Sequence, residues 1–267
     1  MNTSTLYLHI PYCRQACHYC DFHFSTQRST ESALLEAMRN EITLRANQTP
    51  WSGTTLSSLY FGGGTPSFLD TAEIARLIAH AKSLFSFSST IEITLEANPD
   101  DITPEKLEAW HSMGITRLSV GLQSFDDHDL RSMNRAHNAA HSVQCLKWIA
   151  EGPIENYSVD FMYGMPGSSV ESWKDQLDQL ATYLPPHLSC YALTVEEKTV
   201  LHHQINSGET SQPSDEIIVA QFEALRAWAG LHGYTHYELS NFALPNKHSR
   251  HNSHYWSGRP YLGVGPG

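Results

Sequence analysis

The chain has 267 residues, of which 40% are hydrophobic and 17% charged, and its formal net charge is −11 at pH 7. This composition excludes whole-chain disorder, and the length suits one large domain or two small ones with a sizeable core. The acidic balance gives no basic face for general nucleic-acid binding. No apolar run approaches the ~18 residues of a membrane span, and no signal peptide is visible. We therefore expect a cytoplasmic protein without a transmembrane segment or nucleic-acid partner, with peripheral membrane contact left open.

Strand-like and helix-like segments alternate along the chain. The pattern predicts strands at residues 6–10, 55–61, 90–96, 117–121, 156–162 and 187–193. It predicts helices at 30–46, 70–84, 103–114, 137–151, 168–184 and 214–232, with a short helical piece at 127–133. The expected N-terminal caps are Asp70 with Glu73, Thr103 followed by Pro104, and Ser168 with Glu171. A polar stretch without regular structure is expected at 196–213.

Six strand–helix units in succession predict an α/β fold with a parallel sheet and helices outside. The sheet is either an open doubly wound one or a partial six-unit barrel, since eight units close a full barrel. In both architectures ligands gather where the strands end. The chemically suggestive residues all fall there: a cysteine loop, the triplet Gly62-Gly63-Gly64, Glu96, Gln123 and Asp160.

The last part of the chain departs from this pattern. A short strand is expected at 234–239, followed by the polar, His-rich stretch 247–256. The chain then stops at 263–267, where the sequence predicts no closing helix or cap. We therefore expect a partial barrel over 1–232 and the start of a truncated C-terminal extension over 233–267.

Three of the five cysteines, Cys13, Cys17 and Cys20, lie within eight residues of each other. An odd count in a cytosolic chain argues against a disulfide framework. Cys145 and Cys190 lie in apolar stretches, which is typical of buried small hydrophobic residues. Closely spaced thiolates repel one another unless a cation or cluster neutralises them, so the first three cysteines predict a metal centre.

The spacing of these cysteines fits two kinds of centre. A zinc site needs four ligands, and His18 or His23 would supply the fourth. A 4Fe–4S cluster needs only the three thiolates if one iron keeps an open position for a ligand. The Gly-Gly-Gly-Thr-Pro run after the second strand supports a nearby small ligand, because glycine lets the backbone approach closely.

The chain resembles the radical S-adenosylmethionine superfamily and, within it, the coproporphyrinogen III dehydrogenase group. Four segments carry the resemblance: 6–13, 60–67, 121–125 and 160–167. The resemblance implies a six-stranded partial barrel and a 4Fe–4S cluster on Cys13, Cys17 and Cys20. It also implies an S-adenosylmethionine site. The methionine end would be lined by Tyr7, Gly63, Gly64 and Thr65, and its charged amino-acid end would meet Glu96 and Arg135. Gln123 and Asp160 would hold the ribose, and Tyr19 would lie by the adenine.

Each of these assignments has a purely structural alternative. Arg135 and Asp160 would pair as a buried ion pair, and Glu96 would only turn the chain before Asn98-Pro99. Gln123 would be an ordinary loop amide, and Tyr7 would belong to a buried strand.

Two departures place the chain closer to the HemW-type haem chaperone branch than to the dehydrogenases. The dehydrogenases carry a further cysteine where this chain has Phe22, and a longer arm than the twelve residues that precede Cys13. The branch mark His-Asn-x-x-Tyr-Trp is present from His251 to Trp256. His248, His251 and His254 recur every three residues, so on a helix they would share a face.

The resemblance therefore implies a haem chaperone that passes haem to an unidentified acceptor protein, with His251 and Trp256 in the haem site. The alternative is an enzyme that oxidatively decarboxylates coproporphyrinogen III, although we expect no such activity. A third hypothesis is a zinc protein with a related barrel fold. Whether the chain is an enzyme stays open at this stage.

Overall fold

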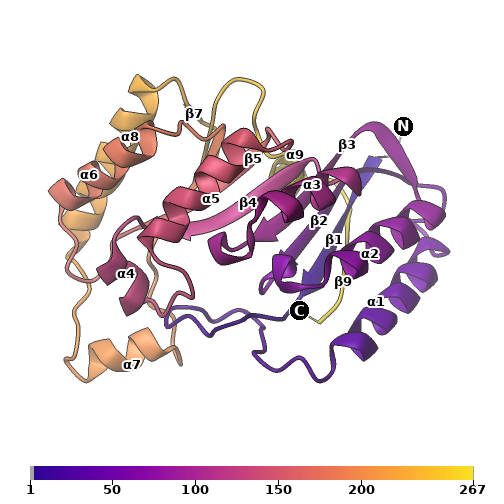
Figure 1. Cartoon of the computed structure of the whole chain (residues 1–267), viewed down its shortest axis with the longest axis horizontal. Coiled ribbons are helices and arrows are strands. Elements are labelled where there is room, and N and C mark those ends of the chain that lie inside the picture. Colours follow the sequence, from indigo (N-terminus) through magenta and orange to yellow (C-terminus); the bar gives the residue numbers. More distant parts are fainter. Residues whose placement is uncertain (1–2, 267) are drawn as a thin grey trace.

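The computed structural model describes residues 3–266, whose strands form one open nine-stranded sheet (Figure 1). Across the sheet the order is β7 (Thr235–His236), β8 (Asn241–Ala243), β6 (His187–Ala192), β5 (Tyr157–Tyr163), β4 (Arg117–Gln123), β3 (Ser86–Ala97), β2 (Thr55–Gly63), β1 (Thr3–Ile10) and β9 (Tyr261–Val264). Strands β1 to β6 are neighbours in chain order and run parallel. The α/β partial barrel of six strand–helix units is thereby confirmed.

Helices follow the strands as the pattern predicts. They are α1 (Glu31–Ala46), α2 (Thr71–Leu84), α3 (Pro104–Ser112), α4 (Asp127–Ser132), α5 (Ala139–Glu151), α6 (Val170–Ala181), α7 (Val200–Asn206), α8 (Asp215–Leu231) and α9 (Arg250–Trp256). The Thr103 cap is confirmed, because its side chain accepts a hydrogen bond from the Lys106 amide. Among residues 3–266, no helix is long and apolar enough to cross a membrane.

Two predicted caps are wrong in detail. Asp70 accepts from the Ala72 amide, and Glu73 forms ion pairs with Arg39 and Arg76 instead of returning to the cap. The cap of α6 is Ser169, which forms a reciprocal capping box with Ser172. Strand β3 begins four residues earlier than predicted, and α7 lies inside the stretch 196–213 that we expected to be irregular.

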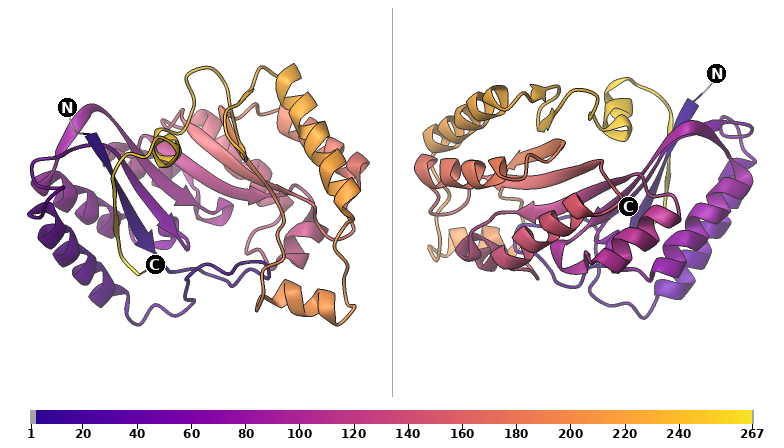
Figure 2. Two further views of the ribbon diagram at one scale, coloured as in Figure 1. Left: turned by 180° about the vertical axis from the view of Figure 1, so that it is seen from behind. Right: turned by 45° about the horizontal axis from the view of Figure 1, so that its top comes forward.

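The C-terminal part of the chain adds strands to both edges of the sheet. Strand β8 pairs antiparallel with β6, and β9 pairs parallel with β1. Helix α9 lies between them on the opposite face of the sheet from α2 and α3 (Figure 2). The predicted boundary at residue 232 stays a prediction, and the last element of the described chain is the strand β9, which the sequence did not predict. His248 lies before α9, so it does not share a helical face with His251 and His254.

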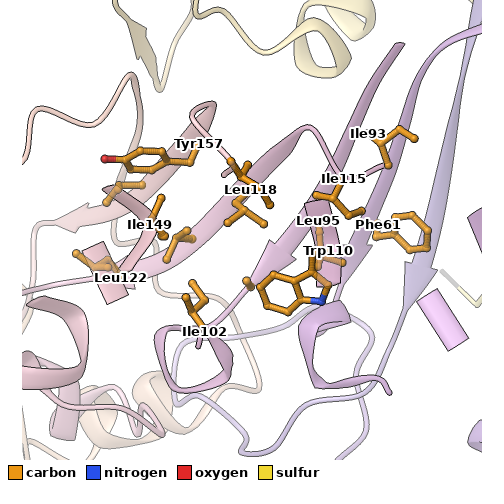
Figure 3. Packing of buried hydrophobic residues seen from close by; sticks show 14 of the residues in the cluster. Phe61, Ile93, Leu95, Ile102, Trp110, Ile115, Leu118, Leu122, Ile149 and Tyr157 are labelled. Atoms are coloured by element: carbon orange, nitrogen blue, oxygen red, sulfur yellow. The ribbon is translucent and has the colours of Figure 1, made fainter. Parts of the chain in front are cut away.

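Alternation along the strands separates an apolar face from a polar one. Leu95 and Leu118 are register partners on the outer face, where they contribute with Trp110 and Ile102 to the main core (Figure 3). The alternate residues point to the inner face, because side chains in a strand alternate sides. They are polar at most positions: Ser58, Tyr60, Thr94, Glu96, Arg117, Ser119, Ser158 and Asp160. The inner face is therefore chemically suited to a polar ligand.

Candidate functional site

The cysteine loop leaves the C-terminal end of β1 and is held at three places. At its base, the Cys13 amide donates to the Ser25 carbonyl over 3.0 Å, and the Ser25 amide donates to the Pro11 carbonyl over 2.7 Å. In its middle, the His18 amide donates to the Met133 carbonyl, and the His18 carbonyl accepts from Leu201. The loop conformation therefore depends on α4 and α7 as well as on β1.

The three cysteines of this loop are free and partly exposed. Among the described residues, the one set of three ligand atoms within 4.8 Å of each other belongs to Asp126, His128 and Asp129. The cysteine sulfurs thus lie too far apart to surround a single ion as a set. A 4Fe–4S cluster binds each thiolate through a different iron, so sulfurs that do not all lie within 4.8 Å of each other fit the predicted cluster better than the alternative zinc site.

The alternative fourth zinc ligands, His18 and His23, are each held by a contact with a neighbouring segment. Nδ1 of His18 lies 2.9 Å from the Ser132 carbonyl oxygen. His23 lies beside His9, whose Nε2 lies 3.0 Å from the His23 carbonyl oxygen. This contact ties the far end of the loop to β1.

Burial of the thiols disfavours free thiolates and so favours a cationic metal centre that neutralises them. Burial raises the pKa of Cys13 to about 11, and burial also raises the pKa of Cys20. The Thr65 hydroxyl donates to Cys13 Sγ over 3.6 Å and partly offsets the effect. Iron that replaces these protons would relieve the cost of burying thiolates. The donor set therefore fits an iron–sulfur cluster.

The glycine triplet packs directly against β1 and the loop. A Cβ on Gly63 would lie 2.8 Å from the His9 ring, and one on Gly64 would lie 2.9 Å from Cys13 Sγ. The Gly64 amide donates to the Ile10 carbonyl, and the Thr65 amide donates to the Tyr12 carbonyl, both over 2.8 Å. The triplet is thus required for packing of the chain against its own cysteine loop.

Arg135 connects the loop to the ends of β3 and β4. Its Nη1 lies 3.4 Å from both Cys17 Sγ and the Tyr19 hydroxyl, and its Nη2 donates to Asn98 Oδ1 and the Gly121 carbonyl over 2.8 Å. Its Nε is buried without a partner in the described part of the chain. Among these residues it forms no ion pair with Asp160, so the structural alternative for that pair is not realised.

Glu96 and Asp160 face the inside of the sheet. Glu96 accepts from the Tyr60 hydroxyl at 2.8 Å and from the Gly63 amide at 3.1 Å. Asp160 accepts from Ser119 Oγ at 3.2 Å. Burial raises the pKa of each carboxyl group to about 7. Among residues 3–266 neither half-buried carboxylate forms an ion pair, so both can bind a cation or hydroxyl groups.

The remaining predicted residues lie around the same opening. Gln123 is buried with φ of 69° at a bulge between β4 and β5, and its side-chain amide has no hydrogen-bond partner in the structure described. Tyr7 stacks on Tyr60 with ring centroids 5.8 Å apart, and burial raises its pKa. Tyr19 packs against the small apolar cluster around Met133.

Comparison with known proteins shows the family to which the chain belongs. Residues 7–180 match the family model described as the radical SAM superfamily. The heme chaperones HemW of Haemophilus influenzae and Bacillus subtilis are each 33% identical over 98% of this chain and 69% of their own length. The chain belongs to the radical SAM superfamily, in the group of the HemW proteins.

Other relatives are longer than this chain. The mitochondrial radical S-adenosyl methionine domain-containing protein 1 of Danio rerio is 35% identical over 99% of the chain, which spans 59% of that protein. The structure of the coproporphyrinogen III oxidase HemN from Escherichia coli superimposes with a TM-score of 0.84 at 26% identity, covering 98% of this chain and 63% of HemN. The chain thus spans about three fifths of the length of these two proteins.

Membership in the radical SAM superfamily implies a 4Fe–4S cluster and S-adenosylmethionine. The predicted residues come together near the C-terminal ends of the parallel strands, where the His251 ring lies 6.2 Å from that of Tyr7, whereas Trp256 is exposed. Sequence reasoning missed Asn98, which lies 3.4 Å from Thr65 Oγ1 and accepts from Arg135. The turn at Asn98-Pro99, which begins two residues after Glu96, was the available signal.

His251 and Trp256 lie on α9, and His251 packs against Tyr7 and Tyr60 on the inner face. His251 is 1% exposed, stacks on Tyr60 with centroids 4.7 Å apart, and has Nδ1 within 2.9 Å of Ser58 Oγ. Its Nε2 lies 3.2 Å from the Tyr255 hydroxyl. Trp256, in contrast, is 70% exposed. Of the two, the tryptophan is the one that a ligand at the surface can reach.

The raised pKa of Glu96 predicts how S-adenosylmethionine binding in this radical SAM protein depends on pH. We propose that the ammonium of the ligand pairs with the ionised carboxylate of Glu96, which forms as pH rises through about 7. We expect affinity to rise roughly 10-fold from pH 6 to pH 8. The stability of the ligand-free protein changes in the opposite direction. Because the pKa of Glu96 is higher in the folded protein than its usual value of 4.5, the free energy of unfolding falls as pH rises from 4.5 toward 7.

Anaerobic calorimetric titrations at pH 6 and pH 8 test this expectation. The Glu96→Gln variant is the control, and its affinity should vary less with pH. Equal wild-type affinities at both pH values would contradict the expectation.

Proposed function

We propose that this protein is a haem chaperone that binds haem together with a 4Fe–4S cluster and S-adenosylmethionine, and passes haem to an acceptor protein. The observation that carries the proposal is the match of 98% or more of the chain to several curated heme chaperones HemW. Phe22 and the His251–Trp256 motif agree with it. The function would be exercised in the cytoplasm, and the acceptor would be recognised as a protein partner.

The cluster would be held by Cys13, Cys17 and Cys20. Glu96 and Arg135 would bind the amine and the carboxylate of S-adenosylmethionine, because they offer opposite charges near the C-terminal ends of β3 and β4. Asp160 and Gln123 would accept and donate hydrogen bonds at the ribose hydroxyls. Gly63, Gly64, Thr65 and Tyr7 would line the methionine end, and Tyr19 would pack by the adenine.

In this arrangement the side chains of the protein would orient the cluster and S-adenosylmethionine and balance their charges. When bound, the cluster supplies a redox-active iron with an open coordination position. Arg135 donates toward Cys17 Sγ, which stabilises a thiolate there. Tyr60 and the Gly63 amide hold the Glu96 carboxylate in one orientation, so the amine of the ligand meets a preorganised acceptor.

Haem contact by the segment His251–Trp256 stays part of the proposal. The rings of Tyr255 and Tyr261 meet edge to face at 5.0 Å and are 44% and 52% exposed beside Trp256. Exposed aromatic rings of this kind can pack on a flat macrocycle. His251 would hold Tyr255 in place, because its ring contacts the Tyr255 hydroxyl on one side and Ser58 and Tyr60 on the other.

We expect haem binding and no porphyrinogen decarboxylation. The anaerobically reconstituted protein is mixed with haem and, in a parallel sample with reductant and S-adenosylmethionine, with coproporphyrinogen III. A new Soret band without formation of protoporphyrinogen supports the chaperone. Protoporphyrinogen formed over many turnovers would instead favour the dehydrogenase.

A further inference from the structure

Asn98 lies in the turn after β3 and contacts a partner of each of two thiols in the cysteine loop. Its Nδ2 lies 3.4 Å from Thr65 Oγ1, and its Oδ1 accepts from Arg135 Nη2 over 2.8 Å. Thr65 in turn donates to Cys13 Sγ over 3.6 Å, and Arg135 Nη1 lies 3.4 Å from Cys17 Sγ. One amide side chain therefore joins the side chains that donate to two of the three predicted cluster ligands.

The guanidinium group determines which way the Asn98 amide points. Arginine can only donate hydrogen bonds, so the atom of Asn98 that faces Arg135 is the carbonyl oxygen. The NH2 group then faces Thr65, whose hydroxyl oxygen accepts from it. Because a hydroxyl has a single proton, the proton of Thr65 stays free to point at Cys13 Sγ. The hydrogen bonds thus run in one direction, from the amide to the hydroxyl and from the hydroxyl to the sulfur.

The backbone of Asn98 is held on both sides. Its amide donates to Ser67 Oγ over 3.3 Å, and its carbonyl accepts from the Asp101 amide over 3.0 Å. The buried Asp101 carboxylate accepts from Ser67 Oγ over 2.8 Å and from Arg14 Nη2 over 2.7 Å. Arg14 directly follows Cys13, so the contacts that fix the Asn98 backbone also fasten the cysteine loop to this turn.

We propose that Asn98 is a positioning residue that raises the reduction potential of the 4Fe–4S cluster by holding the donors to Cys13 and Cys17. Reduction adds negative charge to a cluster and its thiolates, and hydrogen bonds to the sulfurs stabilise that charge. The inference rests on the cluster of the proposed function and adds a residue that controls how readily it is reduced.

The first variant is Asn98→Asp, which keeps the size of the side chain and the acceptor for Arg135. The NH2 group is replaced by an oxygen, so the Thr65 hydroxyl turns to donate to the new carboxylate and no longer to Cys13 Sγ. A charged hydrogen bond contributes ~1.5–3 kcal/mol, so we expect one-electron reduction to become ~10-fold less favourable, a shift of the midpoint potential by ~59 mV toward negative values.

The potential of the reconstituted protein is measured anaerobically, with dithionite as the reductant and the EPR signal of the reduced cluster as the readout. Asn40→Asp makes the same amide-to-carboxylate change on an exposed position of α1 and should keep the wild-type potential. Iron and sulfide content is measured in every variant, so that the potentials compared belong to intact clusters.

The charge that Asn98→Asp introduces also lowers the potential through space, and Thr65→Val separates the two effects. This change removes the hydroxyl, so by itself it should also shift the potential toward negative values. In the Thr65→Val background Asn98→Asp contributes only its charge, and its shift should be smaller than in the wild type.

Equal shifts by Asn98→Asp in the two backgrounds would overturn the inference and leave the cluster assignment standing. A wild-type potential in Thr65→Val would do the same, even if Asn98→Asp failed to hold a cluster. A wild-type protein that takes up no iron and sulfide would overturn the inference together with the cluster of the proposed function.

Discussion

The triple variant Cys13→Ala, Cys17→Ala, Cys20→Ala should lose its bound iron and sulfide while the sheet stays folded. The three thiols are the only cysteines near the ends of β1 and β2 in the described chain, because Cys145 and Cys190 are buried in the core. The fold should survive, since the loop contributes Tyr12 but none of its cysteines to the main core.

Iron and sulfide analysis after anaerobic reconstitution measures this effect, and circular dichroism reports the fold. Cys145→Ala is the matched control, because it removes a thiol without touching the loop. Full iron and sulfide content in the triple variant would disprove the cluster assignment.

Glu96→Gln should weaken S-adenosylmethionine binding by roughly 10–100-fold. The substitution keeps the shape of the side chain but removes the charge that would pair with the ammonium of the ligand. A hydrogen bond to a charged group contributes ~1.5–3 kcal/mol, and ~1.4 kcal/mol corresponds to tenfold in affinity. Arg135→Ala should have an effect at least as large, because Arg135 also contacts Cys17, Tyr19 and Asn98.

Calorimetric titration of the reconstituted variants measures the loss. Glu36→Gln on the exposed side of α1 is the charge-matched control and should bind as wild type. Cluster content must be unchanged in Glu96→Gln, so that weaker binding is attributed to the carboxylate. Wild-type affinity in both Glu96→Gln and Arg135→Ala would reject the assigned site.

The regular part of the fold was predictable because its signals are local. Alternation and apolar periodicity mark the six parallel strands and the long helices, and strand ends then place Glu96, Gln123 and Asp160 together. Strand β9 was not predictable, because its four residues pair with β1 from the opposite end of the chain. Helix α7 has only seven residues, too few for periodicity to show in a polar stretch.

The sequence predicted which residues form the site but not the hydrogen bonds between them. The residue types and their places at strand ends indicate the ligands, whereas the partners of Arg135 depend on how the loop docks onto α4. The special role of the glycine triplet also appears only in three dimensions, where Gly64 lies against Cys13 Sγ. The burial of His251 follows from the position of α9 on the inner face, which no local pattern predicts.

The most direct test of the account is haem transfer. The reconstituted protein is loaded with haem, freed of unbound haem by desalting, and mixed anaerobically with an apo-haemoprotein whose holo spectrum is distinct. We predict that haem stays with the protein through desalting and then moves to the acceptor, whose own Soret band appears. No haem retained after desalting, or retained haem that never reaches an acceptor, would contradict the chaperone function.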